Sequence, residues 1–241
     1  MSAEPAITVV RVGSGPPRPR PALRSFPSHV RIWLVTAVGL AADLWTKQWA
    51  FDSLQPAETR PLISGWLQLR LSLNPGALFG MGRALAPLFV GASVLALMFV
   101  LYLFAHSHAR QRIMHLALGC VLAGALGNLY DRTLISAYVW RNTQDESQYV
   151  GTFIRRDAQS VTIGDFPSGA HPRMLPITPE TVDMPRPVVR DFLQITKHAA
   201  GIHLWPWIFN IADVLLVVGV GTLLGVFWFE GRRRDRNVDF R

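Results

Sequence analysis

Residues 205–229 read WPWIFNIADVLLVVGVGTLLGVFWF, and Asp213 is the one charged side chain among them. A helix rising about 1.5 Å per residue needs roughly 20 apolar residues to cross a bilayer, so the stretch predicts a membrane-spanning helix. Placing a carboxylate in lipid costs roughly 2.5–3.5 kcal/mol even on the gentler scales, so Asp213 is expected to face protein or a water-filled cavity. Asn210 lies three residues earlier and is expected on the same helical face. Taken alone, the two side chains are as typical of contacts that only hold helices together as they are of a functional site.

Three further apolar stretches, at about 30–51, 84–104 and 113–130, predict three more spans. Residues 1–27 are rich in proline and arginine, which predicts a disordered basic tail. This tail is not expected to be a cleavable signal peptide, because the apolar segment after it starts late and contains Asp43 and Lys47. These two residues are spaced i,i+4 in the acid-before-base order that favours an ion pair on one helical face.

The chain has 24 Lys and Arg against 16 Asp and Glu. The densest basic groups flank the apolar segments, which indicates membrane topology and contact with anionic lipids and argues against nucleic-acid binding. One cysteine, Cys120, excludes an internal disulfide and a multi-cysteine metal site. The histidines near residues 106–115 have spacings typical of a solvated loop, so we expect neither metal nor cofactor.

Basic residues in the N-terminal tail, the 105–112 loop and the C-terminal segment place both termini in the cytoplasm, and an even number of spans agrees. The polar residues of several segments are then expected together near the outer face: Asp43, Lys47, Asn128, Asp131, Arg132, Asn210 and Asp213. Contacts between helices alone would not be expected to segregate polar residues at one depth in this way.

Two outer segments connect the spans. Alternating residues 67–73 predict a strand that leads into a turn at Asn74-Pro75-Gly76. Residues 133–186 form a long polar insertion, in which 149–164 predicts a hairpin and 165–187 is expected to be irregular. Residues 187–199 are expected to form a short helix that carries Asp191.

Three acids, Asp131, Asp191 and Asp213, are expected near the outer ends of the spans. Two carboxylates held close together share a proton, so one can activate water while the other protonates a leaving amine. This chemistry predicts an aspartyl hydrolase. A small proton-coupled transporter and a non-enzymatic membrane scaffold are the alternatives. The transporter is expected to show midplane carboxylates and inverted repeats, and the scaffold does not explain the clustered acids.

Five motifs in this chain resemble, in order and setting, those of lipoprotein signal peptidase, the bacterial signal peptidase II. They are Asp43-Leu-Trp-Thr-Lys47, Asn74-Pro-Gly-Ala-Leu-Phe-Gly80, Gly127-Asn-Leu-Tyr-Asp-Arg132, Val189-Arg-Asp-Phe192 and Phe209-Asn-Ile-Ala-Asp213. The resemblance implies an all-α membrane protein with four transmembrane helices, a small extracytoplasmic strand cradle and, in this chain, a long outer-loop insertion. It implies a monomeric, metal-free aspartic endopeptidase of the bacterial inner membrane, with its active site toward the outer face. Its substrates would be diacylglyceryl-modified prolipoproteins cut before the lipidated cysteine, and globomycin-type cyclic peptides would inhibit it.

The resemblance also implies roles for individual residues. It makes Asp191 and Asp213 the catalytic pair, with Asp131 as the runner-up, held ionised by its neighbour Arg132. It implies that Asn128, Arg132 and Asn210 orient the catalytic pair or the substrate backbone. Asn74 and Gly76 would belong to the cradle, and Asp43 and Lys47 would brace the first helix against the site. Pro75 and the insertion are departures from the family pattern. The expected organisation is a basic cytoplasmic tail at 1–27, a peptidase domain at 28–229 with its insertion at about 133–186, and a second basic cytoplasmic tail at 230–241.

Overall fold

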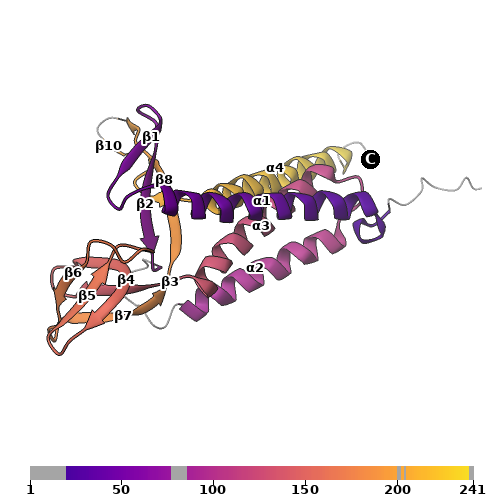
Figure 1. Cartoon of the computed structure of the whole chain (residues 1–241). Helices are drawn as coiled ribbons and strands as arrows, with labels where there is room; N and C mark the ends of the chain where they lie inside the picture. The colour runs from indigo at the N-terminus through magenta and orange to yellow at the C-terminus, as the bar shows by residue number, and fades with distance from the viewer. Residues whose placement is uncertain (1–19, 77–85, 200–201, 204, 239–241) are drawn as a thin grey trace, which may run out of the picture.

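The computed structural model describes residues 20–76, 86–199, 202–203 and 205–238. A short 3-10 helix, η1 (Ala22–Arg24), precedes four long helices: α1 (Phe26–Ser53), α2 (Ala86–His106), α3 (Arg112–Leu134) and α4 (Ile211–Val238). The start of α1 and the end of α4 lie at one end of the helix bundle, and the β-sheets lie at the other (Figure 1). Four helices match the four predicted apolar stretches. Helix α1 begins at Phe26, within the residues 1–27 predicted as a tail, and residues 1–19 of that prediction lie outside the described residues.

Small residues let α3 pack closely between α1 and α4. A Cβ added to Gly124 would collide with the backbone of Ala212 and lie 2.7 Å from Leu216, so the α4 backbone depends on the missing side chain. On the α1 side, Ala123 is fully buried, and its Cβ would lie 2.8 Å from a Cβ added to Gly39. The small residues Ala123 and Gly124 therefore permit close approach on both sides of α3. Leu118 and Leu122 extend this contact into a core that includes Ile32 of α1.

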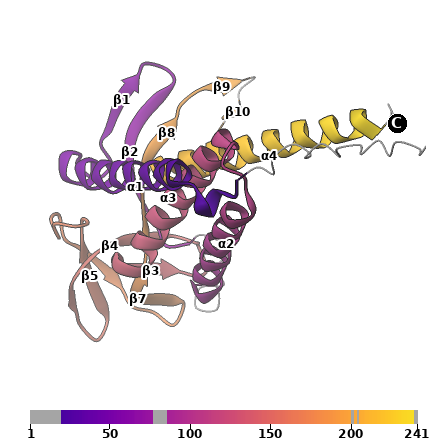
Figure 2. The same ribbon diagram turned by 90° about the vertical axis from the view of Figure 1, so that its right-hand side faces the viewer.

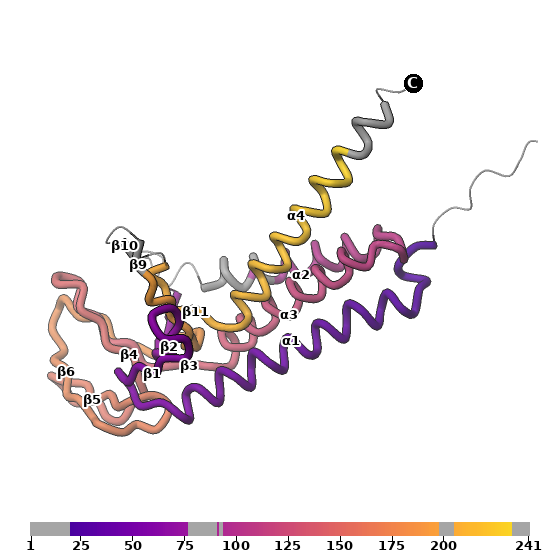
Figure 3. Tube along the Cα trace, turned by 90° about the horizontal axis from the view of Figure 1, so that it is seen from above, coloured from indigo at the N-terminus to yellow at the C-terminus, as the bar shows by residue number. Residues whose placement is uncertain are grey.

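The outward faces of the helices are apolar. Val217, Leu224 and Trp228 of α4 expose 69%, 64% and 61% of their surface, as α4 diverges from the other helices toward its C-terminal end (Figures 2 and 3). A water-soluble protein rarely exposes contiguous apolar area of this extent, whereas a lipid-facing surface requires it. By length and composition, α3 and α4 are each able to cross a membrane.

The fourth helix starts later than the sequence predicts. The segment from Trp205 to Asn210 is not helical: Ile208–Phe209 is a short strand, β11, and α4 begins at Ile211. Asp213 therefore lies in the first helical turn of α4. Pro206 disfavours a helical conformation at Trp205, and the pairing of β11 with a strand from another segment holds the following residues extended.

A four-stranded antiparallel sheet lies across the end of the bundle in the order β1-β2-β8-β11. Its longer strands are β1 (Thr59–Ile63), β2 (Leu67–Asn74) and β8 (Val189–Ile195). The prediction of a strand at 67–73 is confirmed, and the prediction of a helix at 187–199 is wrong. β8 is extended because β2 and β11 bond to its two edges, and its residues from Val189 to Leu193 are buried on both faces. A separate two-stranded sheet pairs β9 (His198–Ala199) with β10 (Ile202–His203).

The insertion forms a five-stranded sheet, in the order β6-β5-β4-β3-β7. Its strands are β3 (Ser136–Asn142), β4 (Gln148–Arg156), β5 (Ser160–Gly164), β6 (Arg173–Pro176) and β7 (Thr181–Pro187). The hairpin predicted at 149–164 is confirmed. The irregular structure predicted at 165–187 is wrong for β6 and β7, whose prolines lie at or near strand ends and on edge strands, where a missing N–H is tolerated. Trp140, Val161 and Ile163 form a small core for this sheet.

Candidate functional site

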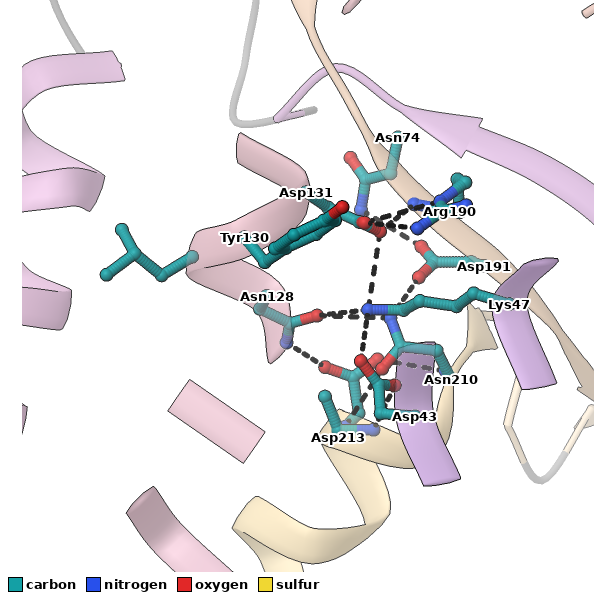
Figure 4. A network of polar contacts seen from close by, with 12 residues as sticks. Asp43, Lys47, Asn74, Asn128, Tyr130, Asp131, Arg190, Asp191, Asn210 and Asp213 are labelled. Atoms are coloured by element: carbon teal, nitrogen blue, oxygen red, sulfur yellow. Dashed lines mark hydrogen bonds and ion pairs between the residues drawn. The ribbon is translucent and has the colours of Figure 1, made fainter. Parts of the chain in front are cut away.

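Polar side chains from α1, β2, α3, β8 and the start of α4 converge where the helix bundle meets the β1-β2-β8-β11 sheet (Figure 4). Their convergence agrees with the expectation that acids and amides of separate segments collect at one depth. The labelled members are Asp43, Lys47, Asn74, Asn128, Tyr130, Asp131, Arg190, Asp191, Asn210 and Asp213.

Asp213 and Asn210 cap the start of α4 reciprocally. The backbone N–H of Asp213 donates to Oδ1 of Asn210 at 3.1 Å, and the backbone N–H of Asn210 donates to Oδ2 of Asp213 at 3.1 Å. This is a capping box, so Asn210 stands just before the helix and not on its face as the sequence analysis predicts. Asn128 of α3 donates its amide to Oδ1 of Asp213 at 2.8 Å. The half-buried Asp213 carboxylate is thus fixed by hydrogen bonds from two segments.

Asp191 lies on the central strand β8 with 4% of its surface exposed. Its carboxylate accepts hydrogen bonds from Nδ2 of Asn210 at 2.6 Å and from Nδ2 of Asn74 at 3.4 Å. Burial, and next the negative charge of Asp213, raise the pKa of Asp191 to about 7, although the two amides oppose the rise. A carboxyl group with this pKa exchanges its proton near neutral pH, as a general acid requires.

The Asp43–Lys47 pair supports this arrangement from α1. Nζ of Lys47 lies 2.8 Å from Oδ2 of Asp43, both side chains are fully buried, and the predicted ion pair is confirmed. Lys47 also donates to Oδ1 of Asn128 at 3.3 Å. Asp43 uses its other oxygen to accept the backbone N–H of Ala212 at 2.8 Å. α1 therefore contacts both the α3 amide that binds Asp213 and the first turn of α4.

Asp131 has a different partner from the one that the sequence analysis predicts. Its carboxylate is bound by Arg190 of β8, with Nη2 at 2.8 Å and the backbone N–H at 3.0 Å, and by Lys47 at 3.3 Å. The neighbouring Arg132 instead interacts electrostatically with Asp191 and Asp213. Successive residues on a helix point in different directions, so Arg132 cannot share the direction of Asp131. The Asp131 side chain is therefore held by two basic side chains, from β8 and from α1.

Arg190 is not among the site residues predicted from the sequence. It also donates from Nη1 to Oε1 of Gln48 at 3.1 Å, which joins β8 to α1. Adjacent residues on a strand face opposite sides, so Arg190 and Asp191 serve separate groups of partners although both are buried. The signal available in the sequence was a charged residue next to Asp191 inside an otherwise apolar stretch.

Asn74 and Gly76 form the turn predicted after β2. The backbone N–H of Gly76 donates to Oδ1 of Asn74 at 2.9 Å, and Gly76 has a φ of 82°, which glycine adopts without strain. Pro75 fits between them, because proline followed by a glycine at positive φ suits a tight turn. The rest of that motif, residues 77–80, lies outside the described residues. Among the described residues, no cluster of His, Cys, Asp and Glu side chains could hold a metal ion.

Comparison with known proteins relates most of the chain to signal peptidases. Residues 35–229 match the family model described as signal peptidase (SPase) II. A lipoprotein signal peptidase from Desulfitobacterium hafniense is 25% identical over 205 residues, which cover 85% of this chain and 97% of that protein. A protein of the same name from Shouchella clausii is 26% identical over 206 residues, 86% of this chain and 98% of its own. A bacterial membrane enzyme solved by the in meso method has a similar fold, with a TM-score of 0.54 at 19% identity, covering 81% of this chain and 90% of that one.

Proposed function

The chain belongs to the signal peptidase II family, and on this premise we propose that it is an aspartic endopeptidase that removes signal peptides from prolipoproteins. The bond cut is the one before a cysteine that already carries diacylglycerol. Asp191 and Asp213 are the catalytic residues. The other polar residues of the site hold this pair in place, and no cofactor takes part.

The observation that carries the proposal is that one buried residue, Asn210, contacts both acids. It donates its side-chain amide to Asp191 and its backbone N–H to Asp213. Two acids supplied by a strand and a helix are thereby kept within electrostatic range of each other. Asp131 has no such link in the described residues, because its oxygens bind Arg190 and Lys47.

The two environments divide the catalytic work. Asp213 lies at a helix N-terminus and accepts hydrogen bonds from Asn128 and Asn210, an arrangement that suits an ionised carboxylate. Acting as base, it takes a proton from a water molecule whose oxygen attacks the scissile carbonyl carbon. Asp191, with its pKa near 7, holds the proton that passes to the leaving nitrogen as the C–N bond breaks. Arg132 supplies positive charge beside both acids.

The helices are proposed to span the inner membrane with both termini in the cytoplasm and the sheets outside. The support is the distribution of basic residues at the end of the bundle opposite the site. There, the backbone N–H of Ala22 donates to the carbonyl oxygen of Ser107 at 2.9 Å, and the backbone N–H of Ala109 donates to the carbonyl oxygen of Arg20 at 2.9 Å. The N-terminal segment and the α2–α3 loop therefore lie together. Basic residues of this end include Arg20, Arg24, Arg31, Arg110 and Arg112.

The test is cleavage of a diacylglyceryl-modified prolipoprotein by the purified full-length protein, with and without a globomycin-type peptide. Asp191→Asn and Asp213→Asn should each abolish cleavage without changing the melting temperature greatly, because an amide cannot take or give the required proton. Asp145→Asn, in the exposed turn between β3 and β4, is the matched control and should retain full activity. Turnover by Asp191→Asn, together with a folded but inactive Asp131→Asn, would transfer the acid role to Asp131.

A further inference from the structure

A pocket of about 470 Å³ lies between the insertion on one side and β2 with the end of α1 on the other, outside the polar network of the candidate site. Phe51 at the end of α1 and Phe166 of the insertion meet edge to face beside it, with ring centroids 6.0 Å apart. The side chains that matter for its chemistry are Phe51, Leu71, Leu73, Tyr149, Asp165 and Arg173. Its walls therefore come from both the four-stranded sheet and the insertion sheet.

One wall of the pocket is a strand edge without a partner strand. β1 pairs with β2 only from Leu67 to Arg70, whereas β2 continues to Asn74 along β8. The chain leaves the ladder before Thr59 through a turn in which the N–H of Glu58 bonds to the carbonyl of Gln55 at 3.0 Å. In the described part of the chain, no strand pairs with the outer edge of residues 71–73, which line the pocket. An exposed edge of this kind is a template for an added extended peptide.

This edge is one strand away from the catalytic pair. Ser72 is the Cα partner of Asp191 across the β2–β8 ladder, and Ser72 also lines the pocket. Neighbouring strands are about 4.8 Å apart, and an extended chain advances about 3.3 Å per residue. A peptide cut at Asp191 therefore reaches this edge within a few residues of the cut.

The walls indicate what such a peptide should carry. Leu71, Leu73 and Phe51 offer apolar contacts. Asp165 is engaged, because it accepts the Tyr149 hydroxyl at 3.3 Å and lies 2.7 Å from Nδ1 of His171. Arg173 stacks over the Tyr149 ring at 5.3 Å, and no carboxylate of the described residues lies within ion-pair distance of it. The pocket thus combines apolar area with a cation suited to an acidic side chain.

We propose that this pocket binds the mature segment of the prolipoprotein, as an extended strand added to the edge of β2 with an acidic side chain against Arg173. The inference rests on the proposed function. Of the two sides of the cut, the signal peptide is expected as an apolar helix in the bilayer, where its backbone must bond to itself. The mature segment is the part that leaves the site toward the sheets and has free backbone groups. The insertion therefore selects among substrates without acting on the reacting bond.

The test compares lipidated peptides that share one signal segment and differ after the cysteine. One ends shortly after the cysteine, one continues with an aspartate-containing segment, and one carries lysine in place of each aspartate. The acidic long peptide should have the lowest KM, with kcat equal for all three. N-methylation along its mature segment should raise KM about fivefold at every second position only, since every second N–H of an added strand faces its neighbour.

Variants separate the charge from the fold. Arg173→Glu should raise KM for the acidic peptide at least about fivefold and make the lysine peptide the better substrate, with kcat unchanged. Arg155→Glu, an exposed arginine of the same sheet outside the pocket lining, should change neither value. Joining Ser136 to Pro185 by a short glycine linker removes Tyr149 and Arg173. The loop-closure cost is small, because the β3–β7 register places Ser136 and Pro185 close together. That variant should keep its turnover on the short peptide and lose every preference among the long ones.

The outcomes separate the pocket assignment from the proposed peptidase function. Equal KM values for the three peptides, or N-methyl effects without a period of two, would overturn the pocket assignment while leaving the peptidase intact. A deletion variant that enters the membrane correctly and binds the short peptide without cutting it would show that the insertion helps to build the active site. That result would contradict the proposal that the insertion only selects among substrates. Failure of the unaltered enzyme to cut any of the peptides would overturn the proposed function and this inference with it.

Discussion

Replacing Asn210 should move the pH dependence of cleavage in a direction that the structure fixes. Asn210 is fully buried and donates a hydrogen bond to Asp191 at 2.6 Å. Burial and the charge of Asp213 raise the pKa of Asp191 to about 7, and the Asn210 hydrogen bond opposes this rise because it stabilises the ionised carboxylate. Removing the donor should raise that pKa further. A hydrogen bond to a charged group contributes about 1.5–3 kcal/mol, and about 1.36 kcal/mol corresponds to one pH unit. The alkaline limb of kcat/KM, expected near pH 7 in the unaltered enzyme, should therefore move upward by about one to two pH units.

Two substitutions at this position separate the acid from the helix cap. Asn210→Ser keeps an oxygen that can accept the N–H of Asp213, whereas Asn210→Ala removes the cap as well. Both should shift the alkaline limb by a similar amount. Only Asn210→Ala should also lose about 1 kcal/mol of stability, measured by thermal unfolding in detergent.

The assay is cleavage of a short lipidated peptide across neutral and alkaline pH, with kcat/KM fitted for each enzyme. The sign is the decisive result, because a group needed in its protonated form works to higher pH when its pKa rises. An alkaline limb that stays in place in both variants, or that moves to lower pH, would refute the assignment of Asp191 as the acid. A limb that moves only in Asn210→Ala would attribute the effect to the cap instead.

The remaining predictions concern packing, the buried ion pair and topology. Gly127→Ala should destabilise the protein by about 1–3 kcal/mol in thermal unfolding, because the new Cβ would collide with the Asp43 carboxylate, whereas Gly221→Ala, with nothing within 4 Å, should be neutral. Arg190→Met should cost about 3–5 kcal/mol by leaving Asp131 short of a buried partner, and adding Asp131→Leu should recover part of this loss if the pair is structural. A topology reporter after residue 231 should score cytoplasmic and one within 140–180 extracytoplasmic, and the reverse labelling would place the proposed site on the wrong face.

Local features of the sequence were enough for the helices and for one ion pair. A membrane helix bonds its own backbone, so an apolar stretch predicts it without knowledge of any partner. Asp43 and Lys47 are spaced i,i+4, so the helix alone brings them together, and their 2.8 Å contact follows. The same holds for the hairpin in the insertion, whose two strands are neighbours in the chain.

Contacts between distant segments depended on the tertiary structure. Val189–Ile195 is a strand because β2 and β11 flank it, and no property of the stretch itself distinguishes that outcome from the short helix predicted there. Asp131 pairs with Arg190, which is 59 residues away, and not with its neighbour Arg132. Asn210 became a cap because β11 delays the start of α4. The sequence by itself determined where the four long helices lie and which acids the proposed chemistry can use, since these depend on residue type and short spacing. Which acid contacts which partner was decided by the tertiary structure, because strand pairing and buried ion pairs join segments whose separation in the chain carries no information about their distance in space.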